Sequence, residues 1–176
     1  MTEGDAWKHG RPVHATLLVQ NDIGLKNLYK LVSQSNINFF ARVPRIPRSV
    51  LDQYREGLVI GTGDTSGDVI ITLIEKGRDE ALKKARYYDY IEIQPTANYA
   101  PMLESELIAN TEKLHAILKE MVSIGDQLKK PVVVTGDVKY TNPEDKIYRD
   151  ILIATQPGNP QNRTALPKLH FRTTQD

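Results

Sequence analysis

The sequence predicts an α/β fold built from repeated βα units with parallel strands. The clearest unit lies at residues 131–140, PVVVTGDVKY, where a run of β-branched residues ends at Gly136 and Asp137. Such a run is typical of a strand that is buried on both faces, and it follows a long amphipathic helix pattern. The same pairing of strand and helix patterns occurs four times without a hairpin signal, which predicts a parallel sheet with right-handed crossovers. Four units would form half of a barrel or a small open sheet.

The first two units lie in the N-terminal half of the chain. Residues 14–20, HATLLVQ, are predicted to form a strand, and a helix then begins at Asp22 and continues through Val32. The second predicted strand covers residues 57–62, GLVIGT, and an apolar helix over residues 69–75 follows it.

The third and fourth units follow the same order. A charged helix over residues 78–88 leads to an alternating strand over 90–94, YIEIQ. The next helix has Asn110 or Thr111 as its cap and leads to the fourth strand, over 132–137. Its predicted buried stripe consists of Leu114, Ile117, Leu118, Met121, Ile124, Gly125 and Leu128.

The last predicted helix covers residues 143–155. Asn142 is suited to cap it, with a proline at the first helical position. Its apolar residues recur at helical spacing, so we expect a buried stripe of Ile147, Ile151 and Leu152.

Composition narrows the class of protein. The chain has 176 residues and a formal net charge of +1, so bulk electrostatics indicate neither a nucleic-acid-binding nor a membrane-surface protein. It contains no cysteine, which excludes a disulfide framework and a thiolate metal site. Because no apolar run reaches about 18 residues and no signal peptide is evident, no membrane partner is expected. We interpret the chain as one cytoplasmic domain.

Three arginines lie in the proline-rich segment RVPRIPR: Arg42, Arg45 and Arg48. Its two prolines exclude a helix interior and favour an extended chain, on which the arginines could contact phosphates. The alternative, which we favour, is a solvated connector whose arginines pair with nearby acids. A short helix over residues 50–56 follows, with Ser49 as its predicted cap.

The glycine-rich turn over residues 63–68 follows the second strand and precedes a helix. That arrangement can cradle a phosphate, but the glycine spacing is one residue too long for the dinucleotide-binding fingerprint. Asp64 would also meet a pyrophosphate with like charge. A nucleotide-binding α/β protein is therefore only a minor alternative.

Carboxylate and imidazole groups fall at the strand boundaries. His14 begins the first strand, and Asp64 and Asp137 follow the second and fourth strands. In parallel α/β folds, catalytic and ligand-binding groups collect at the carboxyl ends of strands. These residue types suit Zn, Mn or Fe, which can activate water for hydrolysis. The alternative is that the histidine is an edge residue and that each aspartate only forms a turn.

Several stretches together resemble one family. HATLLVQNDIGLKNLYKLVS, FFARVPRIPRSVLDQYREGLVIG, YDYIEIQPTANYAPM, VVVTGDVKYTNPEDKIYRDILI and LHFRTT are similar to the PHP (polymerase and histidinol phosphatase) domain of PolC-type DNA polymerase III α subunits. The resemblance implies part of a distorted (β/α)₇ barrel that acts mainly as a scaffold for DNA polymerisation and proofreading. The alternatives are a metal-dependent phosphoesterase or 3′–5′ exonuclease.

The resemblance also implies a place in a longer chain. Residues 1–12 would be a linker from a preceding exonuclease domain, 13–156 the C-terminal part of the PHP barrel, and 157–176 an extended segment leading to the polymerase palm. The expected partners are the rest of that polymerase chain and, through it, DNA. The first PHP half, with a His-x-His metal motif, would be missing. Unpaired strand edges in the isolated piece would favour a homodimer, and the piece alone is expected to be inactive.

In the family's metal site, His14 matches a ligand and Asp137 matches the Asp of a Gly-Asp-Val-His-Tyr motif. Asp64 stands where relatives carry Cys, and Lys139 stands where they carry His. A protonated lysine cannot ligate a metal. No firm cofactor is expected, although Zn or Mn could bind weakly or with partial occupancy. We expect Lys139 to extend into the site and to replace the metal's charge; the alternative is that it points to solvent.

Overall fold

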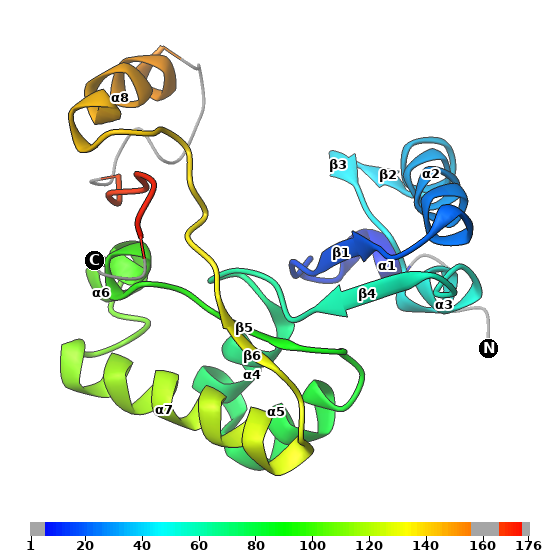
Figure 1. The fold of residues 1–176 in the computed structure, drawn as a ribbon, viewed down its shortest axis with the longest axis horizontal. Coiled ribbons are helices and arrows are strands. Elements are labelled where there is room, and N and C mark those ends of the chain that lie inside the picture. The colour runs from blue at the N-terminus through cyan, green and yellow to red at the C-terminus, as the bar shows by residue number, and fades with distance from the viewer. Residues whose placement is uncertain (1–5, 156–165, 174–176) are drawn as a thin grey trace.

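The computed structural model describes residues 6–155 and 166–173, which form a mixed α/β fold with small sheets (Figure 1). Among them, no helix is both long and apolar enough to cross a membrane. The elements in chain order are α1 (Ala6–His9), β1 (Thr16–Val19), α2 (Asp22–Ile37), β2 (Phe40–Ala41), β3 (Val43–Pro44), α3 (Arg48–Gln53), β4 (Leu58–Gly61), α4 (Asp68–Lys76), α5 (Arg78–Ala85), β5 (Ile91–Ile93), the 3₁₀ helix η1 (Thr96–Tyr99), α6 (Ala100–Glu104), α7 (Thr111–Leu128), β6 (Val132–Val134), the 3₁₀ helix η2 (Pro143–Asp145) and α8 (Lys146–Ala154).

The four predicted strands form, but their pairing agrees with the prediction only in part. β5 and β6 run parallel, with Ile91 opposite Val132. β1 and β4 run antiparallel, with Thr16 opposite Gly61, so the prediction of four parallel strands is wrong. Two helices and the unexpected β2–β3 hairpin separate β1 from β4, and this additional reversal returns the chain in the opposite direction. A parallel bridge between Gly61 and Tyr90 connects β4 to β5.

The described strands therefore form small sheets, and the (β/α)₇ barrel stays a prediction. In Figure 1, β1 and β4 lie beside α2 and α3 at one end of the molecule, whereas β5 and β6 lie over α4, α5 and α7.

Local sequence signals explain where the two longest helices begin. α2 begins at Asp22 as predicted, and the side chain of Asn21 caps it by accepting a hydrogen bond from the backbone N–H of Gly24 at 2.9 Å. Asn110 caps α7 in the same way, with a distance of 2.8 Å. Gly24 also packs on Gly57: a Cβ added at Gly24 would lie 1.9 Å from the carbonyl oxygen of Gly57. This close approach fixes α2 against the start of β4.

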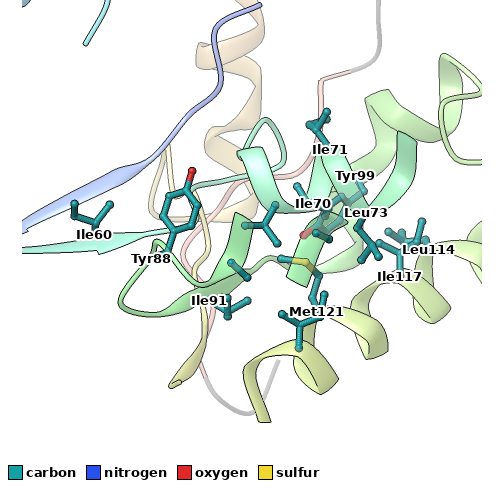
Figure 2. Close-up of a cluster of buried hydrophobic side chains, with 14 of the residues drawn as sticks. Ile60, Ile70, Ile71, Leu73, Tyr88, Ile91, Tyr99, Leu114, Ile117 and Met121 are labelled. Atoms are coloured by element: carbon teal, nitrogen blue, oxygen red, sulfur yellow. The ribbon is translucent and has the colours of Figure 1, made fainter. Parts of the chain in front are cut away.

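The hydrophobic core lies where α4, α5 and α7 pack against β5 (Figure 2). The predicted stripe of α7 faces it, and the stripe's central residues, Leu114, Met121 and Ile124, are at most 1% exposed. Gly125 allows β6 to approach, because a Cβ there would lie 2.2 Å from a methyl carbon of Val132. Among the described residues, the other largest fully buried hydrophobic side chains are Leu31, Ile60, Val69, Ile91, Tyr99 and Ile108.

Two segments predicted to be buried are exposed. β6 is not buried on both faces, since Val134 is 69% exposed and its strand has only one partner strand among the described residues. The predicted stripe of α8 is also wrong: Ile147, Ile151 and Leu152 are between 56% and 66% exposed, whereas Ile153 is buried. In both places the described chain supplies no second layer to cover the apolar face.

Candidate functional site

The residues selected from the strand ends lie together in one pocket. His14, Asp64, Asp137 and Lys139 all line this pocket, which has a volume of about 530 Å³. The two aspartates thus face the same pocket, as the strand-end argument predicted, and their role as metal ligands stays a prediction. Other polar lining residues come from the turn after β4, the end of β5 and α8; they include Ser66, Gln94, Asn98 and Arg149.

The strand order separates the two aspartates. Asp64 follows β4 and Asp137 follows β6, and β5 lies between these strands. The two aspartates therefore do not follow neighbouring strands of the sheet. The pocket spans three strand ends, which leaves room for each aspartate to have a partner of its own.

Asp64 is paired with His14. The Nδ1 atom of His14 lies 2.9 Å and 3.0 Å from the two carboxylate oxygens of Asp64. The backbone N–H of His14 also donates to the carbonyl of Ser66 at 3.0 Å, which fixes the first strand beside the glycine-rich turn. Gly63 is required in that turn, because its φ is +81° and a Cβ would lie 2.6 Å from the carbonyl oxygen of His14.

Asp137 is paired with Lys139. The Nζ atom of Lys139 lies 2.7 Å from a carboxylate oxygen of Asp137, and both side chains are partly exposed. Asp137 adopts a left-handed backbone conformation, with φ +48°. That conformation turns the chain immediately after β6. The backbone N–H of Lys139 donates to Leu169 at 2.9 Å, which ties the segment to the C-terminal part of the described chain.

The floor of the pocket contains residues that the sequence analysis missed. Asn98 donates to the side chain of Gln94 at 3.1 Å and to the carbonyl of Gly136 at 3.0 Å, so it holds the turn before Asp137. Tyr99 accepts a hydrogen bond from the backbone of Gln94, and burial raises the pKa of its hydroxyl to about 12. A signal was available: Gln94 is a polar residue at the carboxyl end of a strand, the criterion that selected the two aspartates.

The charged side chains of the pocket are arranged in two contacts, one for each aspartate. The part of the chain that the structure describes contains no group of three or more histidine and acidic side chains placed to hold one. Asp64 and Asp137 already contact an imidazole and an ammonium group respectively, and an ammonium group has no lone pair to offer. The arrangement is one imidazole–carboxylate contact and one ammonium–carboxylate ion pair around a polar cavity.

Two of the three arginines have partners within the described chain. Arg48 pairs with Asp68 at 3.1 Å and stacks on the ring of Tyr87 at 4.2 Å, which agrees with the favoured alternative. Arg45 instead donates to backbone carbonyls in residues 7–10 and holds α1 in place. Arg42 is exposed and has φ +65°. Its contact with phosphate stays a prediction.

The cap predicted for the short helix is wrong. α3 begins at Arg48 and has Pro47 as its N-cap residue, so Ser49 lies inside the helix. Proline is favoured at this boundary because its ring fixes φ near the value found at helix starts. The N–H that it lacks would have no partner within the helix.

Comparisons with known proteins show which family this chain resembles. The model of the PHP domain family matches residues 3–99, which is more than half of the chain. The chain is 53% identical to DNA polymerase III PolC-type of Listeria innocua and 51% identical to that of Pediococcus pentosaceus, in each case over its whole length. The corresponding protein of Staphylococcus aureus is 49% identical. The chain spans 12% of the length of each of these relatives. It therefore belongs to the PHP domain family, and its whole length matches a segment of PolC-type DNA polymerases III.

Proposed function

We propose that the chain is the PHP segment of a PolC-type DNA polymerase III, in which it acts mainly as a scaffold for DNA polymerisation and proofreading. The observation that carries this proposal is the identity of about half of all positions along the entire chain to such polymerases. A core that spans α4, α5, α7 and β5 gives the segment the rigidity that a scaffold needs.

The PHP metal site is degenerate in this chain. Lys139 replaces a metal ion as the positive group beside Asp137, and the 2.7 Å ion pair supports this role. Without a cation, two carboxylates in one pocket would repel each other and one would be driven towards protonation. The pairing of Asp64 with His14 and of Asp137 with Lys139 reduces that repulsion.

The segment has a defined place in the longer polymerase. Residues 13–156 form the C-terminal part of the PHP barrel, after an exonuclease insertion. Residues 1–12 are the linker from that exonuclease domain, and residues 157–176 lead to the polymerase palm. DNA is reached through the parent protein. The contacts of Arg45 with the backbone of residues 7–10 support a firm connection at the N-terminal side.

Metal content tests the degenerate site. We expect the purified chain to bind neither Zn nor Mn stoichiometrically in elemental analysis, and Lys139→His to raise affinity for both, because imidazole can ligate them. In the longer polymerase, Lys139→His should leave primer extension intact. Stoichiometric metal in the unmodified chain, together with Mn-dependent hydrolysis of a nitrophenyl phosphate ester, would instead establish the phosphoesterase alternative.

Stability measurements test the charge replacement. Lys139→Ala should lower the free energy of unfolding by roughly 0.2–1 kcal/mol, because the pair with Asp137 is partly exposed and therefore screened. Lys119→Ala is the matched control, since Lys119 is an exposed lysine with no ion pair among the described residues. Equal unfolding midpoints in urea for both variants would show that the Lys139 pair contributes nothing.

A further inference from the structure

The C-terminal part of the described chain forms one wall of the polar pocket. Residues 166–171, which we call the C-terminal strap, lie beside the extended connection that follows β6 and are drawn in red in Figure 1. Leu166, Pro167 and Leu169 of the strap line the same pocket as the two aspartates. Closure of the pocket on this side therefore depends on a segment that lies far in sequence from the strand ends.

Two residues of the connection after β6, Lys139 and Tyr140, hold the strap. The backbone N–H of Lys139 donates to the carbonyl of Leu169 at 2.9 Å. The backbone N–H of Phe171 donates to the carbonyl of Tyr140 at 3.0 Å. The hydroxyl of Tyr140 accepts a third hydrogen bond, from the N–H of Leu169 at 2.9 Å, and its ring lies 6.5 Å from that of His170. Tyr140 thus holds the strap with both its backbone and its side chain.

Contacts from the pocket hold the same connection. Asn98 in the pocket floor donates to the carbonyl of Gly136 at 3.0 Å, and Lys139 pairs with Asp137 at 2.7 Å. Asp137 lies between these contacts with φ +48°, a backbone conformation that few residues other than glycine adopt. A displacement of the strap therefore moves Lys139, because the backbone of Lys139 is bound to the strap and its side chain to Asp137.

The strap has few buried contacts of its own. Leu169 is 3% exposed, whereas Phe171 is 60% exposed and Lys168 is also exposed. Segments that bury little apolar surface open locally at a lower free energy than the core. Three hydrogen bonds and one buried side chain therefore allow the strap to leave the pocket while β6 and α7 stay folded.

We propose that the C-terminal strap is a movable wall of the polar pocket and that Tyr140 is the residue that holds it closed. In the closed state the three hydrogen bonds form, and Lys139 is held beside Asp137. In the open state they break, Leu169 becomes exposed, and solvent enters the pocket from this side. The consequence rests on the proposed function, in which residues 157–176 lead to the polymerase palm. The direction of that connection then biases the pocket towards one state, and a ligand that favours one state biases the connection by the same free energy.

Hydrogen exchange in the isolated chain tests the closed state. Tyr140→Phe removes the acceptor of the Leu169 N–H and keeps the ring. The amides of Lys139 and Phe171 should then exchange at least about threefold faster, although their own acceptors are unchanged, because all three hydrogen bonds break in one opening. Tyr29→Phe is the matched control: Tyr29 is 64% exposed on α2, and its replacement should not alter exchange in the strap.

Asp137→Asn tests the link between the pocket and the strap. Asparagine tolerates a left-handed backbone, so this substitution removes the ion pair and keeps the turn. The amides of Leu169 and Phe171 should exchange about two- to fivefold faster, as loss of a partly exposed ion pair gives. Glu80→Gln is the matched control, because it removes a lysine ion pair on α5 and should leave exchange in the strap unchanged.

The longer polymerase tests the coupling to the palm. Addition of a primer–template duplex should change the exchange rates of the Leu169 and Phe171 amides by more than about twofold, because DNA binding alters the connection that continues from the strap. Unchanged rates would overturn the coupling. The movable wall itself would be overturned if Tyr140→Phe left the amides of Lys139 and Phe171 unaffected, or if Asp137→Asn left those of the strap unaffected.

Primer extension separates these outcomes from failure of the scaffold function. Leu114→Ala disrupts the core. If it impairs extension while primed DNA leaves exchange in the strap unchanged, the scaffold function stands and the coupling falls. If Leu114→Ala has no effect on extension, the scaffold function falls, and the two variants of the isolated chain still decide whether the strap is a movable wall.

Discussion

Helices α7 and α8 have the same kind of amphipathic sequence pattern and opposite environments. The apolar stripe of α7 packs into the core, and Leu114 is fully buried. The apolar stripe of α8 faces outward, and Leu152 is 66% exposed. The difference shows that an amphipathic pattern reports the need for an apolar partner. It does not report whether the partner lies in the same segment of chain.

Truncation of one leucine in each helix should give the largest contrast. Leu114→Ala should lower the free energy of unfolding by about 2–5 kcal/mol, because it leaves a cavity in a closely packed core. Leu152→Ala in the isolated chain should change it by less than about 0.5 kcal/mol, as expected for an exposed side chain. Urea unfolding followed by circular dichroism measures both. Similar losses for the two variants would mean that α8 is packed into the same cooperative unit as α7.

Alkaline pH should lower the free energy of unfolding through Tyr99, which lies in the same hydrophobic core as the apolar stripe of α7. Burial raises the pKa of Tyr99 to about 12, from an ordinary value near 10. The folded chain therefore holds this proton more tightly than the unfolded chain does. The stability linked to it is complete below pH 10 and is lost as the pH rises from 10 to 12, by roughly 1–3 kcal/mol.

Substitution isolates that contribution. Tyr99→Phe should flatten the fall in the free energy of unfolding between pH 10 and 12, and Tyr148→Phe, on the exposed face of α8, is the matched control. The residual slope in Tyr99→Phe should come from Tyr87, Tyr88 and Tyr90, whose pKa values burial also raises to about 12. If Tyr99→Phe and the unmodified chain lost the same free energy of unfolding between pH 10 and 12, the buried hydroxyl of Tyr99 would have no part in that loss.

Helix caps should give the smallest contrast. Asn110→Ala should lower the free energy of unfolding by about 1 kcal/mol, because it leaves an N–H at the start of α7 without its acceptor. Asn142→Ala removes the capping box with Asp145 before α8. We expect it to accelerate hydrogen exchange within α8 and to change global stability much less, since α8 has few buried contacts. Global losses of equal size would contradict the separation of the two helices.

Local patterns in the sequence determined where most elements lie. The four strands formed near their predicted positions, α2 began at Asp22 as predicted, and α7 began after its predicted cap Asn110. The choice of His14, Asp64, Asp137 and Lys139 as pocket residues also came from local information, because strand ends and family motifs mark them. These features depend on periodicity, backbone preference and the hydrogen bonds of a few neighbouring residues, all of which are written in short stretches of sequence.

Only the tertiary structure decided the direction of pairing and the choice of partners. β1 lies antiparallel to β4 because of the reversals between them, which no strand pattern records. Arg45 binds the backbone of residues 7–10 instead of an acid, and Gln94 joins the pocket through Asn98. The orientation of α8 belongs to the same class. Each of these outcomes depends on contacts between residues far apart in the chain. The free energy of those contacts cannot be inferred from any single short stretch of sequence.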